Sequence, residues 1–515
     1  MTKPQIKLQQ SLLPDNLDAA EQSMLDAGVP VYQAAGTLVQ VVRIDDDQDP
    51  THARGSLVIR PMKPQRLVEH MMRAADFFLF NGKDWRPTAP TLAFAAAFMA
   101  RGEWRLRVLK GILEAPTLRH DGSVLTEQGY DPQMQVVLNT GDIQFPPVPE
   151  QPSRADALAA LALLKDVLSG FPFVPDEEPD EFGGHLSSAR SVALSAMLTS
   201  VSRKAMRTAP GHCIDAASAN TGKTLLSDTV AVLATGRPVV PVSYGGTKAE
   251  FNKRMFSVLM QGDPLVSIDN IDEEIESDEL CTIFTSEWWQ NRILGESQNR
   301  QVSTGVLVML NGNNLRIRGD LTSRVISCRM DAQMENPGDR VFDRDLRSYV
   351  PEHRPELVAA ALTVLRAFIV AGRPGVDKLS PMERFADWSN LVRGALVWLG
   401  EPDPLTTRAS VVAVDSAREE TARLHDAWAE VIGYDKWVTA AEVLEASERH
   451  SDPDLGIVGG KPLSEALGTV MSAAALGKQL VALDGLIVDG RCLRRHATVG
   501  HSTKFRLERQ AGEAG

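Results

Sequence analysis

Residues 217–224 read ASANTGKT, and this stretch decides how the chain is interpreted. Its last three letters, Gly-Lys-Thr, match the end of a P-loop, in which backbone N–H groups and a lysine hold phosphates. The motif also has a glycine five residues before Gly222, where this chain has Ala217. Alanine adopts a negative φ without strain and Asn220 tolerates a positive φ, so the loop can still form. The alternative is that Gly-Lys-Thr only begins a helix.

The surroundings of this stretch fit a P-loop, which lies between a buried strand and a helix. Residues 213–216 read as a short strand, and residues 223–234 read as a helix that Gly236 ends. The N-terminus of that helix adds positive potential to the N–H groups of the turn. The predicted nucleotide contacts are Ala219, Asn220, Thr221, Gly222, Lys223, Thr224 and Leu225.

Three further polar residues follow at workable spacing for an ATP site. Asp269 follows an apolar run, 46 residues after Lys223, and can hold Mg²⁺ together with Thr224. Asn313 follows the next apolar run and can orient the attacking water or sense the γ-phosphate. Arg324, 11 residues later, can act as a finger on the nucleotide of a neighbouring subunit. The sequence therefore predicts a site for ATP and Mg²⁺.

The composition is that of an ordinary globular chain. Its 515 residues suggest about three or four domains, and 43% are hydrophobic. Four scattered cysteines without a CxxC pair argue against a disulfide framework or a zinc site and favour a reducing cytosol. No secretory signal and no membrane-length apolar run are evident. We expect a cytoplasmic protein with no membrane partner.

The order of patterns along the chain predicts a multidomain α/β protein. A proline-rich stretch at 145–152 reads as a linker, Ser153 opens a helix with a capping box, and strands alternate with helices from His212. Ser380 opens a further predicted helix with a second capping box. The expected regions are an N-terminal α+β module (1–141), a linker and helical segment (142–210), an α/β ATPase core (211–335), a helical region (336–430) and a C-terminal module (431–510).

The C-terminal module is basic, although the whole chain carries a net charge of −13. Between Val488 and Arg509, six Lys or Arg stand against two acids, a local charge of +4. Three helical runs are followed by a hairpin with a two-residue turn, which predicts a winged helix. Duplex DNA or a docked protein are the two partners that this module suggests. The candidate DNA contacts are Lys478, Arg491, Arg494 and Arg495.

At roughly 210–335 the chain resembles the superfamily 3 helicases, AAA+ ATPases of viruses, phages and plasmids, and above all the helicase part of phage and mobile-element primase-helicases. The resemblance rests on the compact order of P-loop, acid strand, asparagine strand and arginine. It implies an AAA+ core and a ring, a hexamer by this resemblance. It also implies the roles of Lys223, Thr224, Asp269, Asn313 and Arg324 given above.

The chain departs from the pattern of these helicases at two positions. Ala217 replaces the usual first glycine, and Asn270 stands where many relatives carry a second acid. Asn270 remains a catalytic candidate, and the group that activates water stays open. Glu273 and Glu274 are close by, but solvated acids at a helix start are an equal interpretation. Other candidates are Asn311 or Asn314 for the polar sensor and Arg329 for the finger.

Residues 288–302, WWQNRILGESQNRQV, read as two short strands around a polar turn. In the resembling helicases, a hairpin at this place projects into the ring and grips single-stranded DNA. The resemblance implies that Arg292, Asn299 and Arg300 contact the DNA backbone. A surface hairpin whose arginines pair with nearby acids is the alternative.

Together these features predict an ATP-dependent DNA helicase that replicates a phage, plasmid or integrative element. Its expected partners are single-stranded and forked DNA, further copies of itself, and a separate primase or polymerase. An initiator, loader or defence ATPase that binds DNA without processive unwinding is the second hypothesis. A DNA-binding regulator with an inactive nucleotide fold is the third. Residues 1–141 show no convincing paired-carboxylate motif for a primase site.

Overall fold

The computed structural model describes residues 3–45, 53–176, 186–272, 274–292, 299–334, 336–340, 342–413, 416–449, 459–468, 472–496 and 503–509. Contacts divide the chain into two compact units. The first comprises Met1–Leu315 and Ser323–Arg408, and the second comprises Arg316–Thr322 and Ala409–Gly515. None of the helices in the described ranges has the length and apolar character that crossing a bilayer requires.

A five-stranded parallel sheet lies at the centre of the first unit. Its strand order is β14-β15-β18-β13-β19, and every pairing in it is parallel. The runs predicted before the P-loop, the acid and the asparagine are β13, β15 and β18, and they occupy adjacent places. The bounds are β13 (Gly211–Ala216), β14 (Val242–Ser243), β15 (Leu265–Ile271), β18 (Leu307–Asn313) and β19 (Val325–Met330).

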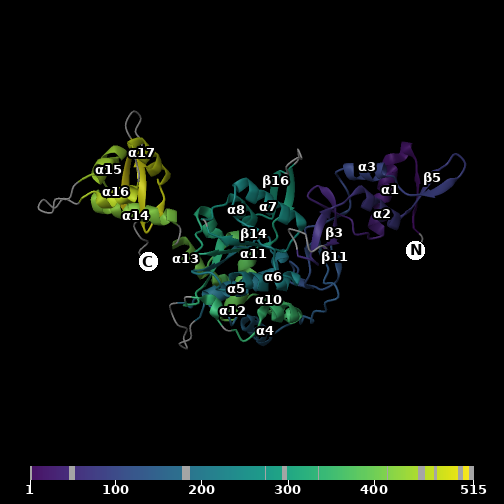
Figure 1. The fold of residues 1–515 in the computed structure, drawn as a ribbon, viewed down its shortest axis with the longest axis horizontal. Helices are drawn as coiled ribbons and strands as arrows, with labels where there is room; N and C mark the ends of the chain where they lie inside the picture. The colour runs from purple at the N-terminus through teal and green to yellow at the C-terminus, as the bar shows by residue number, and fades with distance from the viewer. Residues whose placement is uncertain are drawn as a thin grey trace. The chain divides into compact units, whose positions relative to one another are not determined.

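Helices cover this sheet on both sides. Figure 1 places α7 and α8 on one side of β14, and α5, α6, α10 and α4 on the other. In α5 every residue except Arg190 is buried, because the helix packs between the sheet and α10. The bounds are α4 (Arg154–Val167), α5 (Ser188–Ser200), α6 (Lys223–Thr235), α7 (Lys248–Gln261), α8 (Asp278–Thr285), α9 (Leu346–Glu352) and α10 (Arg354–Val370).

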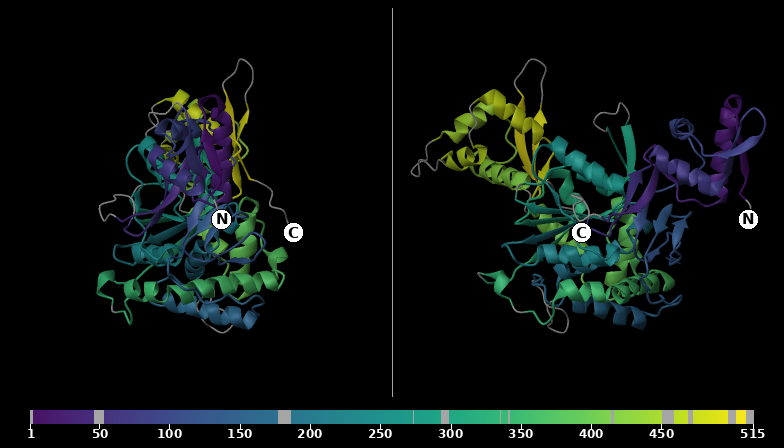
Figure 2. Two further views of the ribbon diagram at one scale, coloured as in Figure 1. Left: turned by 90° about the vertical axis from the view of Figure 1, so that its right-hand side faces the viewer. Right: turned by 45° about the vertical axis from the view of Figure 1, so that its right-hand side comes forward.

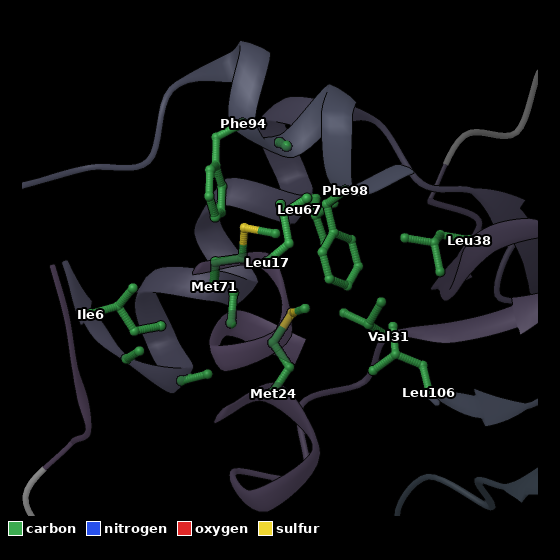
Figure 3. Packing of buried hydrophobic residues seen from close by; sticks show 14 of the residues in the cluster. Ile6, Leu17, Met24, Val31, Leu38, Leu67, Met71, Phe94, Phe98 and Leu106 are labelled. Carbon is green, nitrogen blue, oxygen red and sulfur yellow. The ribbon is translucent and has the colours of Figure 1, made fainter. Parts of the chain in front are cut away.

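The N-terminal part of the first unit is the predicted mixture of helices and strands. Three helices bury an apolar core that includes Met24, Leu67 and Phe98, as Figure 3 shows. Small sheets of order β1-β5-β6, β4-β3-β2-β7 and β11-β12-β8 accompany them. The bounds are α1 (Leu13–Asp26), α2 (Pro64–Ala74), α3 (Leu92–Ala100), β1 (Gln5–Leu8), β2 (Tyr32–Ala34), β3 (Thr37–Arg43), β4 (Leu57–Pro61), β5 (Asp76–Phe80), β6 (Trp85–Thr88), β7 (Arg107–Val108), β8 (Gly111–Leu113), β11 (Gly129–Asp131) and β12 (Val136–Leu138).

The described residues of the second unit include helices α14 to α17, most of α13 (Arg408–Ala413) and an antiparallel sheet of order β20-β23-β22-β21. Figure 2 shows its helices gathered on one side of the yellow strands. The predicted two-residue turn is present: Asp489 and Gly490 both have positive φ, as a type I′ turn requires. The bounds are α14 (Ser416–Val431), α15 (Ala440–Ser447), α16 (Lys461–Leu467), α17 (Ala473–Ala482), β20 (Val438–Thr439), β21 (Ile487–Val488), β22 (Arg491–His496) and β23 (Lys504–Arg509).

Two details differ from the sequence-based expectations. Trp428 of α14 is fully buried in the core of the second unit, so contacts place α14 with the C-terminal module and not with the preceding helical region. Ser380 does not cap a helix. Its hydroxyl and carbonyl accept hydrogen bonds from the buried Arg393, which also pairs with Asp403. The sequence pattern predicted that the Ser380 hydroxyl would cap a helix. In the structure this hydroxyl instead accepts a hydrogen bond from the buried Arg393 guanidinium, which needs acceptors.

Arg354 joins three parts of the first unit. It is 2% exposed and donates hydrogen bonds to the carbonyls of Leu233 and Ala234 at the end of α6 and to the carbonyl of Glu114. Burial lowers the pKa of Arg354 to about 10. The guanidinium satisfies helix-end carbonyls that have no partner within the helix.

We predict that Arg354→Met destabilises the first unit. The change leaves buried carbonyls without a donor, which costs about 3 kcal/mol or more and, in a unit of this size, lowers Tm by roughly 4 °C. Thermal unfolding followed by circular dichroism measures the shift. Arg73→Met is the matched control: Arg73 is exposed and pairs with Glu69, so its loss moves Tm by about 1 °C at most. Equal Tm values for the two variants would contradict the anchoring role of Arg354.

Candidate functional site

The loop between β13 and α6 has the backbone of a strand–turn–helix phosphate cradle. Gly222 has φ +107° at the N-cap of α6, and Asn220 has φ +58°. Ala217 is not among the residues with positive φ, so the missing glycine imposes no strain there. The Thr221 hydroxyl donates to the Ser218 carbonyl at 2.5 Å and closes the turn.

The parallel sheet brings the predicted chemical groups to one edge. Ala216, the last residue before the loop, pairs with Asn313. The Lys223 ammonium donates to Asn313 Oδ1 at 2.6 Å, and the Thr224 hydroxyl donates to Asp269 Oδ2 at 3.1 Å. Lys223, Thr224, Asp269 and Asn313 thus come together from three separate segments. Their order in the sequence predicted this convergence but not the distances between them.

These groups surround a hollow of about 890 Å³, within the range of small-molecule sites. All seven predicted nucleotide contacts, Ala219 to Leu225, line it, as do Asp269, Asn270 and Asn313. Thr224 and Asp269 offer hard oxygen ligands, which suit Mg²⁺. No cluster of three or more His, Cys, Asp or Glu side chains fit for a metal occurs among the described residues. A magnesium ion here would be coordinated by phosphate oxygens as well as by these side chains, as Mg²⁺ is in nucleotide sites.

Burial and two nearby carboxylates act on the pKa of Lys223 in opposite directions. Partial burial lowers the pKa of Lys223, while Asp215 and Asp269 raise it. Asp215 is buried at the end of β13 and accepts hydrogen bonds from the Leu315 backbone and from Arg329, each at 2.8 Å. Burial is the larger effect, so the pKa of Lys223 lies below its ordinary value.

The structure separates the three candidate asparagines. Asn311 is fully buried and bonds to the hydroxyls of Ser227 and Ser267 between α6 and β15, so it holds the fold together. The Asn314 side chain lies 3.5 Å from the Ala217 carbonyl, at the limit of a hydrogen bond. Asn313 lines the hollow and contacts Lys223. Asn313 is therefore the asparagine placed to meet a ligand.

Asn270 remains a candidate for the group that activates water, and Asp272 joins it. Asn270 lines the hollow with φ +56°, and its backbone N–H donates to Asp269. Glu273 lies outside the described residues, and Glu274 is not among the lining residues. Asp272 does line the hollow and is exposed. Sequence reasoning missed Asp272 because it follows strand β15 at an irregular place in the register, which no periodicity reveals.

The two candidate finger arginines lie at opposite ends of strand β19: Arg324 directly precedes the strand, and Arg329 lies near its carboxyl end. β13 and β19 pair in parallel from Gly211–Val325 to Ala216–Met330. The loop follows Ala216 and Arg324 precedes Val325, so six residues, roughly 20 Å, separate them. Arg324 thus cannot reach the loop of its own chain. Arg329 lies near that loop, but it is paired with Asp215.

Arg340 is a contact that sequence reasoning missed. It lines the hollow, donates to the Thr221 carbonyl at 2.7 Å, and stacks over Phe342 with 5.0 Å to the ring centroid. Its segment, after the sheet, returns to the loop through tertiary packing. Three basic residues, Arg340, Arg344 and Arg347, line the same side. Their clustering in the sequence was the available signal.

The predicted hairpin is present as β16 (Trp288–Arg292) and β17 (Asn299–Ser303), with Arg292 opposite Asn299. Residues 293–298 lie outside the described residues, as does the side chain of Arg292. Asn299 is exposed and Arg300 is half-buried. Trp289 packs edge-on against Phe256 of α7, which attaches the hairpin base to the first unit.

The basic residues of the second unit mostly contact acids of the same unit. Arg491 pairs with Asp426, Arg494 lies 3.8 Å from Glu508, and Arg495 lies 3.2 Å from Asp484. Lys478 is exposed on α17. The local charge of +4 is therefore partly neutralised by residues that the local sequence does not include.

Comparisons with known proteins add little. No protein-family model and no curated protein matches this sequence. Among solved structures it is similar to the A form apo structure of the NrS-1 C-terminal region, at 11% identity and TM-score 0.41, covering 96% of this chain and 99% of that chain. A second structure of that region gives a TM-score of 0.38 at 11% identity, with the same coverage. A ligand-bound structure of JCV helicase covers 51% of this chain and 74% of that chain, at 13% identity and TM-score 0.19. Because these TM-scores lie below 0.5, the likenesses carry no argument about this chain.

We predict that Arg340→Ala weakens nucleotide binding about 10-fold, because the loop loses a charge-assisted hydrogen bond and the hollow loses a cation. Titration with a fluorescent ATP analogue measures the affinity, and circular dichroism checks that the variant remains folded. Arg344→Ala is the control, because Arg344 lines the same hollow but its guanidinium pairs with Asp166. Equal loss of affinity in both variants would contradict a specific role for Arg340.

Proposed function

We propose that the chain is an ATP-dependent DNA helicase with an AAA+ core, acting as a ring on single-stranded DNA during replication of a mobile element. The observation that supports this most is the convergence of Lys223, Thr224, Asp269 and Asn313 around one hollow. Such a constellation suits the binding and hydrolysis of a nucleoside triphosphate.

Each residue has a role that follows from its position. Lys223 neutralises the β- and γ-phosphates, and the N–H groups at the start of α6 contact the phosphate oxygens. Thr224 and Asp269 would hold Mg²⁺, which supplies charge neutralisation on the phosphates. Asn313 orients the attacking water beside the γ-phosphate. Asp272 is the proposed acceptor of its proton, because it is an acid on the wall of the same hollow.

The position of Arg324 supports the proposed ring. This residue lies at the amino edge of the sheet, opposite its own loop. An arginine at that edge can stabilise the transition state only at the site of an adjacent subunit. A head-to-tail contact that repeats in this way generates a closed ring when the rotation closes, and a hexamer is the proposed number.

DNA binding is proposed for two elements. Asn299 and Arg300 of the hairpin β16–β17, with Arg292, would contact the phosphates of the translocating strand. We propose that the second unit is a winged helix, which its helices and β-hairpin support, and its proposed DNA contacts are Lys478, Arg491, Arg494 and Arg495. Exposed ion pairs contribute little energy, so Arg494 and Arg495 can exchange a carboxylate for a phosphate.

Complementation in mixed rings tests the role of Arg324. Arg324→Ala keeps an intact loop but lacks the finger, while Lys223→Ala keeps the finger but lacks the lysine. We expect each variant alone to hydrolyse ATP at least about 100-fold more slowly than the wild type. Equal mixing should restore function at about one quarter of the subunit interfaces.

Steady-state ATP hydrolysis beside native mass spectrometry gives the measurement. Recovery requires that the two variants share rings, which the mass spectra establish. If mixed rings form and hydrolysis stays at the level of the separate variants, Arg324 does not act between subunits.

Unwinding of a forked duplex separates the proposed helicase from an initiator, loader or defence ATPase. We expect strand separation that needs ATP and Mg²⁺, is abolished in Lys223→Ala, and rises with subunit concentration as the ring forms. A radiolabelled fork resolved on a gel gives the readout. Hydrolysis that DNA stimulates without any strand separation would favour the second class of function.

A further inference from the structure

The antiparallel sheet of the second unit carries a basic face beside an exposed tryptophan. Leu493, Phe505 and Leu507 are buried against the helices, and side chains alternate along a strand, so their neighbours point to the opposite face. The register sets Arg494 opposite Arg506 and His496 opposite Lys504. We name these residues the outer sheet face: Trp437, Arg494, His496, Lys504 and Arg506.

Trp437 belongs to this face through its position next to β20. Val438 pairs with Phe505, which points to the core, so Trp437 points outward beside Arg506. The Arg506 guanidinium lies 4.6 Å from the centroid of the indole, and the His496 ring lies 5.6 Å from it. Trp437 nevertheless remains 38% exposed. A large aromatic ring held in place on a charged surface suits a ligand with its own flat aromatic surface.

The charges of the face suit a polyanion. Arg494, Lys504 and Arg506 are three cations. Two carboxylates lie beside them, since Glu508 contacts both arginines and Glu442 lies close to Lys504, so these cations exceed the carboxylates by one. The two pairs are partly exposed to solvent, which weakens them, and phosphate offers arginine the same two-pronged geometry as a carboxylate. A phosphate chain can therefore displace Glu508 from the two arginines.

We propose that the outer sheet face binds an unpaired DNA strand, with a base stacked on Trp437 and phosphates on Arg494, Lys504 and Arg506. A base inside a duplex is covered on both faces by its neighbours, so stacking on Trp437 requires an unpaired base. Only the choice of DNA as the polymer rests on the proposed function. The site differs from a recognition-helix contact through Lys478, because α17 packs into the core on the other side of the sheet.

Binding of fluorescent oligonucleotides to the full-length chain, without nucleotide, tests the proposal. Trp437→Ala should weaken binding of a thymidine oligonucleotide about 10-fold, as expected for one stacked base. Trp437→Phe keeps an aromatic face and should stay within about 3-fold of the wild type. Lys461→Ala removes an exposed cation on α16 of the same unit and should leave affinity unchanged. The same set is measured in an Arg300→Ala background, so that the hairpin does not mask the effect.

An oligonucleotide with abasic sites at the same phosphates isolates stacking from charge. The wild type should lose about the factor that Trp437→Ala loses, and Trp437→Ala should bind both oligonucleotides equally. The proposal is overturned if Trp437→Ala binds the thymidine oligonucleotide like the wild type in both backgrounds. The proposal is also overturned if Trp437→Ala and Trp437→Phe weaken binding of the thymidine oligonucleotide equally. It is overturned as well if Trp437→Ala weakens binding of a blunt duplex as much as binding of the thymidine oligonucleotide.

This experiment and the tests of the proposed function fail separately. Trp437-dependent binding with no ATP-driven unwinding would leave the outer sheet face intact and remove the helicase. If ATP-driven unwinding occurs but the Trp437 variants bind DNA like the wild type, the proposed helicase stands and the proposal for the outer sheet face is overturned.

Discussion

The parallel pairing of β13 with β18 is the constraint on which the candidate site depends. Because parallel strands end at the same edge of a sheet, the loop after Ala216 begins opposite Asn313. Lys223 and Asn313, 90 residues apart, then lie within hydrogen-bonding distance. Gly312 makes the approach possible, since a Cβ there would lie 2.4 Å from the carbonyl oxygen of Ile271. A bulkier residue at this position would separate β18 from β15 and move Asn313 away from the loop.

The same parallelism places Arg324 far from the loop of its own chain. A strand that ends at the loop edge must begin at the opposite edge, so a residue that precedes β19 is far from the loop. Arg329 at the other end of that strand is near, but Asp215 engages it. Arg340 supplies a cation to the loop from a later segment. Positive charge at the hollow thus comes from Lys223 of the motif and from Arg340, which tertiary packing brings to the loop.

Charge in this protein is organised by pairs that are distant in sequence. The chain carries −13 overall, and a local excess of basic residues near the C-terminus looks unopposed in the sequence. In the structure, Asp426 of α14 and Asp484 pair with two of those arginines. What distinguishes the outer sheet face is the tryptophan beside its cations, and Trp437 stands about 70 residues before Arg506 in the sequence.

The sequence by itself determined the elements and the order of the chemical groups. Apolar runs, capping residues and the turn at Asp489 predicted the strands, helices and hairpins, because these depend on near neighbours. Only the tertiary structure decided which groups meet. It buried Asn311, placed Asn313 on Lys223, moved the acid candidate to Asp272 and added Arg340. Ser380 shows the same limit, since the buried Arg393 overrode its capping pattern. Distances between residues far apart in the chain follow from strand register and burial, and neither is encoded in a local pattern.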